Sequence, residues 1–172
     1  MSPTPQAILV MGVCGCGKSA LGDRLARELG AVFIEGDDFH PPANVQRMAA
    51  GMALTDADRQ GWLEALAAQL IHASAGGRSA VLACSALKRH YRDTLRRGAP
   101  GLRPIHLTGP RTLLAQRMAA RQGHYMPASL LDSQLATLEA PGPDERAIVL
   151  DVDTPIDTLV QRALAALQVT PA

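Results

Sequence analysis

A glycine-rich stretch near the start of the chain carries the residue types that bind phosphate. Residues 12–19 read GVCGCGKS and follow the apolar run AILVM, so the stretch links an expected strand to an expected helix. Glycines let the backbone curl until successive N–H groups point at phosphate oxygens. Lys18 then reaches the β- and γ-phosphates and the Ser19 hydroxyl binds Mg²⁺, unless the spacing is a chance match in an ordinary turn. The predicted nucleotide contacts are Gly12, Val13, Cys14, Gly15, Cys16, Gly17, Lys18, Ser19 and Ala20.

Two cysteines occupy positions inside this loop. Cys14 and Cys16 are too close in sequence to form a disulfide with each other easily, and no second pair with zinc-site spacing accompanies them. One interpretation is that they replace small residues. The other is that a thiol near a helix N-terminus has a lowered pKa and oxidises readily.

The nearest carboxylates follow the second apolar run, in the sequence FIEGDDFHP. Glu35 and Asp37 are two residues apart, so in an extended segment both side chains face the same side. This spacing suits Glu35 near the Mg²⁺ shell and Asp37 as a general base that orients an acceptor hydroxyl and takes its proton. A solvated acidic turn is the alternative.

Other classes of nucleotide-binding protein need elements that differ from these. A GTPase reads guanine with an NKxD motif, which the sequence lacks, and the DxxG match at 58–61 falls where a helix is expected to begin. A motor ATPase ends a core strand in an acid that binds Mg²⁺, whereas the strand SAVLAC runs on into SAL. These features favour a kinase that phosphorylates a small molecule.

Short apolar runs alternate with longer helical patterns, and these elements must position the candidate residues. Runs without polar alternation are typical of parallel strands covered on both faces. Strands are predicted over 7–11, 31–34, 80–84, 104–107 and 147–150, and helices over 18–29, 57–73, 88–96, 112–120, 129–138 and 155–167. The pattern predicts an α/β fold of the doubly wound type, with five parallel strands in one domain (1–172) after a loose start (1–6). Ligands of such a sheet bind at the carboxyl ends of its strands.

Composition and charge narrow the functional classes further. The formal net charge is +1 and 3% of the residues are aromatic, which argues against a surface for nucleic acid. The sequence has neither a basic-then-apolar leader nor an apolar run near the length of a membrane helix. Three cysteines, an odd number, suit a reducing compartment. We therefore expect a cytoplasmic protein that binds neither nucleic acid nor membrane.

Taken together, these motifs resemble those of the gluconate kinases, a branch of the shikimate-kinase-like P-loop phosphotransferases. The resemblance runs from Ile8 to about Gln168 and rests on GVCGCGKS, GDDFHPPANVQRMAAGMALTDADRQGWL, CSALKRHYRD, RMAARQGHYMP and LEAPGPDERAIVLDVDTP. It implies phosphorylation of D-gluconate at its 6-hydroxyl, with ATP as donor and Mg²⁺ as cofactor. A kinase for another small hydroxy acid or nucleoside is one alternative, and a nucleotide-binding regulator without activity is another.

The resemblance also implies roles on the acceptor side. Asp37 becomes the base and His40 lies close to the sugar acid. Lys88 and Arg92 fall at i and i+4, on one helical face, where they could pair with a substrate carboxylate or a phosphate. A solvated helix face is the competing interpretation.

On the donor side, the resemblance implies a mobile lid at about 121–128. Arg117 is assigned to the adenine and Arg121 to the transferring phosphates, so that Lys18, Asp37 and Arg121 are the predicted catalytic residues. His124 is a candidate substrate contact in the lid. The loop that includes Pro155 resembles the adenine-side loop, and a plain helix start with Thr154 as its N-cap is an equal interpretation of it. Ordinary surface arginines are the alternative. Family members are commonly dimeric, so we expect a homodimer.

The chain departs from the family pattern at a few positions. Cys14 and Cys16 stand where the family commonly has serines, and Glu35 replaces a frequent Asp. The longer side chain of Glu35 is expected to reach Mg²⁺ through water. These changes remove no reacting group.

Overall fold

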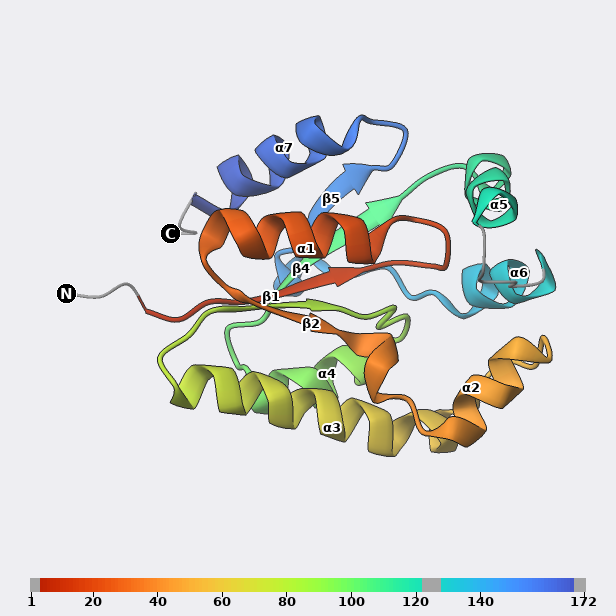
Figure 1. Cartoon of the computed structure of the whole chain (residues 1–172), viewed down its shortest axis with the longest axis horizontal. Coiled ribbons are helices and arrows are strands. Elements are labelled where there is room, and N and C mark those ends of the chain that lie inside the picture. The colour runs from red at the N-terminus through yellow and green to blue at the C-terminus, as the bar shows by residue number, and fades with distance from the viewer. Residues whose placement is uncertain (1–3, 122–127, 169–172) are drawn as a thin grey trace.

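The computed structural model describes residues 4–121 and 128–168, and five parallel strands form its central sheet (Figure 1). The strands are β1 (Ala7–Met11), β2 (Val32–Glu35), β3 (Ala80–Ala83), β4 (Arg103–Thr108) and β5 (Ile148–Asp151). Their order in the sheet is β2-β3-β1-β4-β5, so β1 pairs with β3 on one side and with β4 on the other. The direction of winding therefore reverses at β1, and the crevice at the carboxyl end of such a strand is the usual ligand site.

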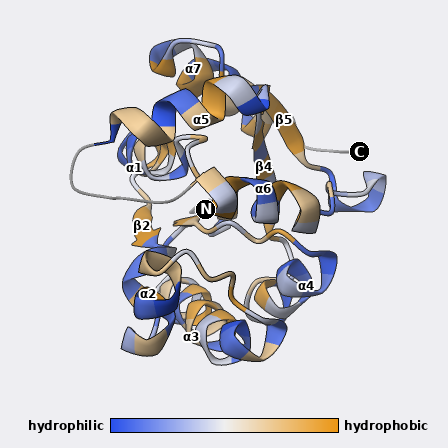
Figure 2. Cartoon of the chain, turned by 90° about the vertical axis from the view of Figure 1, so that its right-hand side faces the viewer, coloured by the Kyte–Doolittle hydropathy of each residue, from blue (hydrophilic) through white to orange (hydrophobic). Residues whose placement is uncertain are grey.

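Helices cover both faces of the sheet. They are α1 (Lys18–Leu29), α2 (Pro42–Ala49), α3 (Asp56–Ala75), α4 (Arg89–Gly98), α5 (Arg111–Ala120), α6 (Ala128–Thr137) and α7 (Ile156–Gln168), with short 3-10 helices η1 (Gly36–Phe39) and η2 (Pro143–Glu145). In Figure 1, α1 and α7 lie together on one face and α3 and α4 on the other. Helices α2, α5 and α6 lie beyond the carboxyl ends of the strands, at the edge that Figure 2 views directly.

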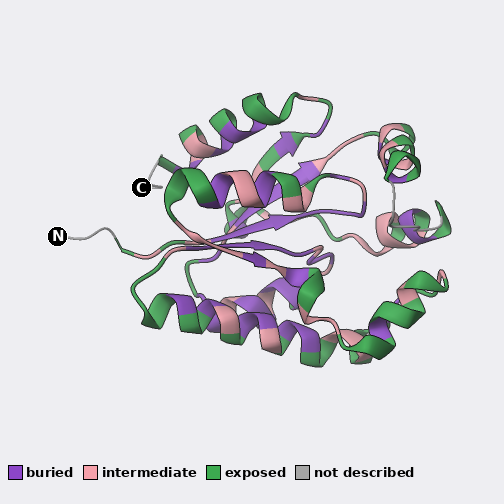
Figure 3. Ribbon diagram, in the orientation of Figure 1, coloured by how far each residue is buried: buried purple, intermediate pink, exposed green. Residues whose placement is uncertain are grey.

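The core lies between these layers, where the apolar runs of the strands are buried (Figure 3). Leu9 and Val10 of β1 and Leu82 of β3 have no exposed surface. Trp62 and Leu66 of α3 add large side chains to the same core. Burial on both faces explains why these strands lack the polar alternation of a half-exposed sheet. No helix within 4–121 and 128–168 combines the length and apolar character that crossing a membrane requires.

The fold confirms the predicted doubly wound sheet, and each predicted strand and helix exists with ends shifted by at most two residues. Two elements between β2 and α3 were missed, namely η1 and α2. Pro41 and Pro42 suggest a loop, but a proline at the first helical position lacks only an N–H that the helix does not use. The chain therefore forms η1 and then α2 just after Glu35, at the edge of the sheet where the site is expected. Most of the predicted lid lies outside the described residues.

Candidate active site

The glycine-rich loop joins the end of β1 to the start of α1, as the sequence predicts. Its three glycines have positive φ values: 144° at Gly12, 81° at Gly15 and 89° at Gly17. A Cβ atom at Gly12 would lie 2.7 Å from the carbonyl oxygen of Leu107, and one at Gly15 would lie 2.8 Å from that of Leu114. Close packing and backbone conformation therefore both require glycine at these two positions.

The start of α1 fits a phosphate group. Gly17 precedes the helix in a left-handed conformation, and no side chain of the described residues caps the first turn. Apart from the chain neighbours of Gly17, no described atom lies within 4 Å of the position that a Cβ there would take. Free N–H groups at a helix start attract anions, and this open space gives a phosphate access to them. The loop residues thus fit the nucleotide that the motif implies.

Lys18 lies over the same loop. Its Nζ donates a hydrogen bond to the carbonyl oxygen of Val13 at 3.1 Å and lies 3.9 Å from the Sγ of Cys16. Ser19 follows in the first turn of α1 and is half-buried. This arrangement places an ammonium and a hydroxyl beside the cradle, which favours their predicted contacts with phosphate and Mg²⁺.

The two loop cysteines are buried, and the surroundings of Cys14 oppose the redox hypothesis for that thiol. Burial raises the pKa of Cys14, although the positive charge of Lys18 acts in the other direction. Its Sγ lies 3.4 Å from the Sδ of Met118 on α5, and its N–H donates to the Oε1 of Gln134 on α6 at 2.7 Å. The interpretation with a lowered pKa is therefore wrong for Cys14, because burial against residues such as Met118 of α5 desolvates a thiol that the sequence places beside a helix start.

The acidic segment differs from its predicted extended form. Glu35 is the last residue of β2, whereas Asp37 lies in η1. The chain therefore turns between Glu35 and Asp37. The prediction that both side chains face the same side assumed an extended segment, which the structure does not have here. The side chain of Asp37 is 79% exposed, and its Oδ1 lies 4.0 Å from the Nε2 of His40. Asp37 and His40, predicted separately as base and substrate contact, thus lie together.

Trp62 anchors this turn, a role that the sequence did not reveal. Its indole Nε1 donates to the carbonyl oxygen of Gly36 at 2.7 Å, and its ring stacks on His40 with 3.9 Å between the centroids. Burial lowers the pKa of His40, so the imidazole is neutral at neutral pH. The Nδ2 of Asn44 lies 3.3 Å from the Nδ1 of that ring. An aromatic residue in an apolar helical stripe indicates a core position, which is correct for Trp62. The hydrogen bond to Gly36 was not predicted, because the two residues are 26 positions apart in sequence.

Lys88 immediately precedes α4 and points toward the start of α3. Its Nζ lies 3.1 Å from the Oδ1 of Asp56, and this hydrogen bond raises the pKa of Lys88. The hydroxyl of Tyr91 also donates to Asp56, and it accepts from the Nη1 of Arg59 at 3.0 Å. A cluster of Lys88, Tyr91, Asp56 and Arg59 therefore links α3 to α4. Only Lys88 of the four was predicted as a site residue, because the others are ordinary helix-start residues in sequence.

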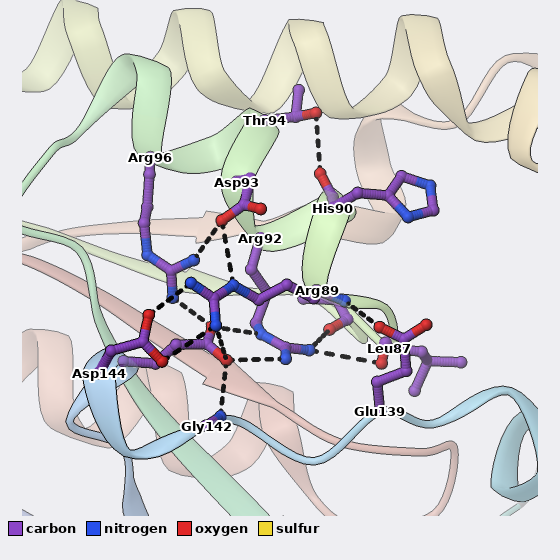
Figure 4. A network of polar contacts seen from close by, with 12 residues as sticks. Leu87, Arg89, His90, Arg92, Asp93, Thr94, Arg96, Glu139, Gly142 and Asp144 are labelled. Atoms are coloured by element: carbon purple, nitrogen blue, oxygen red, sulfur yellow. Dashed lines mark hydrogen bonds and ion pairs between the residues drawn. The ribbon is translucent and has the colours of Figure 1, made fainter.

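Arg92 does not share the surroundings of Lys88. It is fully buried, and its Nε donates to the Oε1 of Glu145 at 2.7 Å. Its Nη1 donates to the carbonyl oxygen of Ala86 at 2.8 Å, so the guanidinium faces protein groups on both sides (Figure 4). The structure contradicts direct substrate binding by Arg92, because helical spacing fixes which residues share a face but not what that face packs against.

Arg117 and the loop after β5 lie together on the donor side. The Nη2 of Arg117 donates to the carbonyl oxygen of Val152 at 2.7 Å, just before the segment that leads to Pro155. Arg121 is exposed at the end of α5. His124 and the rest of the predicted lid lie outside the described residues. The placement of Arg117 is compatible with its predicted adenine contact.

The described residues contain no group of three His, Cys, Asp or Glu side chains placed to hold a metal ion. A divalent ion would therefore depend on few protein ligands and on phosphate oxygens, which is how Mg²⁺ is commonly held in nucleotide sites. Ser19 at the start of α1 and Glu35 at the end of β2 both lie at the carboxyl edge of the sheet. Ser19 and Glu35 therefore fit an Mg²⁺ ion that is otherwise bound by phosphate oxygens.

Comparison with known proteins agrees with this geometry. The family described as an AAA domain matches residues 8–141. Gluconokinase from Gluconobacter oxydans is 45% identical over 168 residues, which cover 98% of this chain and 94% of that protein. Among solved structures, a sugar kinase from a Janibacter species has a TM-score of 0.91 at 48% identity, with 97% of this chain and 96% of that chain covered.

A second solved structure supports the same relationship. A gluconokinase from Sinorhizobium meliloti has a TM-score of 0.86 at 47% identity, with 96% of this chain and 93% of that chain covered. A shikimate kinase from Bacteroides thetaiotaomicron, at 20% identity and a TM-score of 0.65, shares the fold. Since the similarity to a gluconokinase extends over nearly the whole of both chains, this protein belongs to the gluconokinase family of P-loop kinases.

Proposed function

We propose that this protein transfers the γ-phosphoryl group of ATP to the 6-hydroxyl of D-gluconate, giving 6-phospho-D-gluconate and ADP. The observation that carries the proposal is the shared edge of the sheet, where the phosphate loop after β1 and Asp37 after β2 lie in a chain 45% identical to a gluconokinase. A carboxylate beside a phosphate cradle is the arrangement that phosphoryl transfer to a hydroxyl requires.

On the donor side, the loop N–H groups and the start of α1 hold the phosphates. Lys18 exchanges its hydrogen bond to Val13 for phosphate oxygens and stabilises the charge that develops during transfer. Arg117 contacts the adenine next to the loop of Pro155, and Arg121 reaches the transferring phosphate. Planar, permanently charged guanidinium groups suit both contacts.

The Ser19 hydroxyl would hold Mg²⁺ directly, and Glu35 would hold it through water. When bound, it neutralises charge on the β- and γ-phosphate oxygens. Glu35 is half-buried and ends β2 beside β3, at the same carboxyl edge of the sheet at which Ser19 begins α1. The longer side chain of Glu, compared with Asp, extends from a strand end that is already fixed in the sheet.

On the acceptor side, Asp37 orients the 6-hydroxyl and accepts its proton as the phosphoryl group transfers. Its exposure leaves the carboxylate open to a substrate. The neutral His40 beside it keeps its predicted place near the sugar acid, although its side chain is only 4% exposed, and Lys88 offers an ammonium to the gluconate carboxylate in competition with Asp56. His124 completes the predicted acceptor contacts.

The decisive experiment measures ADP release with Mg·ATP across aldonic acids, shikimate and nucleosides. Gluconate should give the highest kcat/KM, and analysis of the product should place the phosphate on the 6-hydroxyl. No acceleration by gluconate would overturn the proposal. Turnover with another member of the panel would then indicate a kinase for a different small hydroxy acid or nucleoside, and ATP binding without any turnover would indicate a regulator.

We also propose a cytoplasmic homodimer with one kinase domain per chain (1–172). The single hydrophobic core built on one sheet supports one domain. Exposed Val149 on the edge strand β5, at 63%, offers apolar surface for a second copy. Sedimentation velocity over a range of concentrations tests the dimer, and a monomer at all concentrations would exclude it.

A further inference from the structure

Three acids of the LEAPGPDER stretch, Glu139, Asp144 and Glu145, contact arginines along α4. Glu145 accepts from Arg92 through both oxygens, at 2.7 Å to Nε and 3.0 Å to Nη2, and it also accepts from Arg96. Asp144 accepts from both Nη atoms of Arg89, and the Oε2 of Glu139 accepts from the backbone N–H of Arg89 at 2.8 Å. Figure 4 shows how this 139–145 segment and the arginines of α4 face one another.

The innermost pair of this network is fully removed from solvent. The side chains of Arg92 and Glu145 are 0% and 1% exposed. Burial raises the pKa of Glu145, but the hydrogen bonds from Arg92 and Arg96 outweigh it and lower the pKa to about 2. Replacing a buried ion pair by well-packed apolar side chains of similar volume is often neutral or stabilising. Stability alone therefore does not account for a paired guanidinium at this position.

The third guanidinium nitrogen of Arg92, Nη1, donates to backbone carbonyls and not to Glu145. The acceptors are the carbonyl oxygens of Ala86 at 2.8 Å and Leu87 at 3.4 Å. Ala86 has a φ of 46°, a left-handed conformation that costs energy for any residue with a Cβ. The Glu139 N–H donates to the Leu87 oxygen at 2.7 Å. The turn at 85–88 is thus held in a strained conformation by donors from Arg92 and from the 139–145 segment.

This turn connects the two halves of the site. The Gly12 N–H of the phosphate loop donates to the carbonyl oxygen of Ser85 at 3.3 Å, at the start of the turn. Lys88 is at its end, where it reaches Asp56. A change in the backbone at Ala86 therefore displaces Lys88 relative to the phosphate loop.

We propose that Arg92, held by Glu145, is a positioning residue that fixes the 85–88 turn and thereby places Lys88 against the acceptor. The proposal rests on the proposed function for the identity of the acceptor. The planar fork of arginine is essential, because one guanidinium must bind a carboxylate through two nitrogens and a carbonyl through a third. Lysine keeps the charge but does not supply this geometry.

The test compares Arg92→Lys and Glu145→Gln with wild type in steady-state kinetics. Both variants should raise the KM for gluconate by about tenfold, since one well-placed hydrogen bond to a charged group is lost, while the KM for ATP changes by less than about twofold. The double variant should raise it by less than the product of the single effects, because Glu145 acts through Arg92. Asp144→Asn is the matched control: it removes an exposed partner of Arg89 in the same network and should leave both KM values unchanged.

A second readout needs no substrate. Amide hydrogen exchange of a peptide covering 84–88 should become faster in Arg92→Lys and remain at the wild-type rate in Asp144→Asn. A loss of thermal stability with unchanged gluconate KM and unchanged exchange at 84–88 would reduce the pair to a structural role and overturn the proposal. If wild type shows no turnover of gluconate, the proposed function fails, while faster exchange at 84–88 still supports the positioning of the turn and unchanged exchange still rejects it.

Discussion

Replacing Trp62 with phenylalanine separates packing from positioning at the turn that carries Asp37. Phenylalanine keeps an aromatic ring in the core but removes the N–H that donates to the carbonyl oxygen of Gly36 at 2.7 Å. Trp62 is 2% exposed and Gly36 is buried, so water does not replace the lost donor. The first turn of η1 thereby loses its anchor to α3.

The cost follows from these contacts. An unsatisfied buried carbonyl costs about 1–3 kcal/mol. The smaller ring leaves unfilled volume beside His40, which adds about 1 kcal/mol. The free energy of unfolding should therefore fall by about 2–4 kcal/mol, and the Tm of a domain of this size by roughly 5–15 °C. Because η1 holds Asp37, kcat should fall by about tenfold or more, with the KM for ATP nearly unchanged.

Thermal and urea unfolding give the stability change, and ADP release well below the lowered Tm gives the kinetic change. Leu70→Ala is the matched control, since Leu70 is 2% exposed on the same helix but about 12 Å farther along it. It should destabilise by a similar amount, about 2–5 kcal/mol, and leave kcat intact. Wild-type kcat in Trp62→Phe would refute the positioning of η1, and an unchanged Tm would refute the hydrogen-bond estimate.

Three further predictions concern separate parts of the molecule. Asp37→Asn should lower kcat by about 100-fold or more if Asp37 is the base, while its exposed side chain predicts a Tm within about 1 °C of wild type; wild-type turnover would exclude that role. Cys14 should react with iodoacetamide at neutral pH at least about tenfold more slowly than free cysteine, because burial raises its pKa, and equal rates would contradict this. Burial lowers the pKa of His106, so the unfolded chain binds the proton more strongly and the free energy of unfolding should fall as the pH drops below about 6.5. His106→Gln should reduce this pH dependence in urea titrations at two pH values, and an unchanged dependence would assign it to other groups.

Local sequence patterns were sufficient to predict the sheet and the phosphate loop. Strands β1, β3 and β4 are buried on both faces, so their sequences are short apolar runs, and GVCGCGKS owes its shape to glycines within the same eight residues. Helix α2 was missed because part of its support is distant in sequence: Asn44 is 4% exposed and its Nδ2 donates to the carbonyl oxygen of Asp58 at 2.8 Å. A proline pair at its start indicates a loop unless that contact is known.

On the acceptor side, contacts between residues distant in sequence limited the prediction even more. Sequence spacing correctly grouped Lys88 and Arg92 near the start of one helix, yet they have opposite environments. Lys88 reaches the cluster at the start of α3, whereas Arg92 pairs with Glu145, 53 residues later. No local pattern identifies a partner at that distance. The acidic residues of the LEAPGPDER stretch were quoted only as part of a family resemblance, and their role emerged from the geometry.

The late position of Glu139 and Glu145 has a consequence for synthesis of the chain. Strands β1 and β3 and the phosphate loop between β1 and α1 are complete before either acid leaves the ribosome. Burying Arg92 without its counter-charge would cost several kcal/mol, so the side chain of Arg92 stays in water until then. The phosphate loop therefore forms early, and the 85–88 turn reaches its final form only after residues 139–145, at the start of the last fifth of the chain, have emerged.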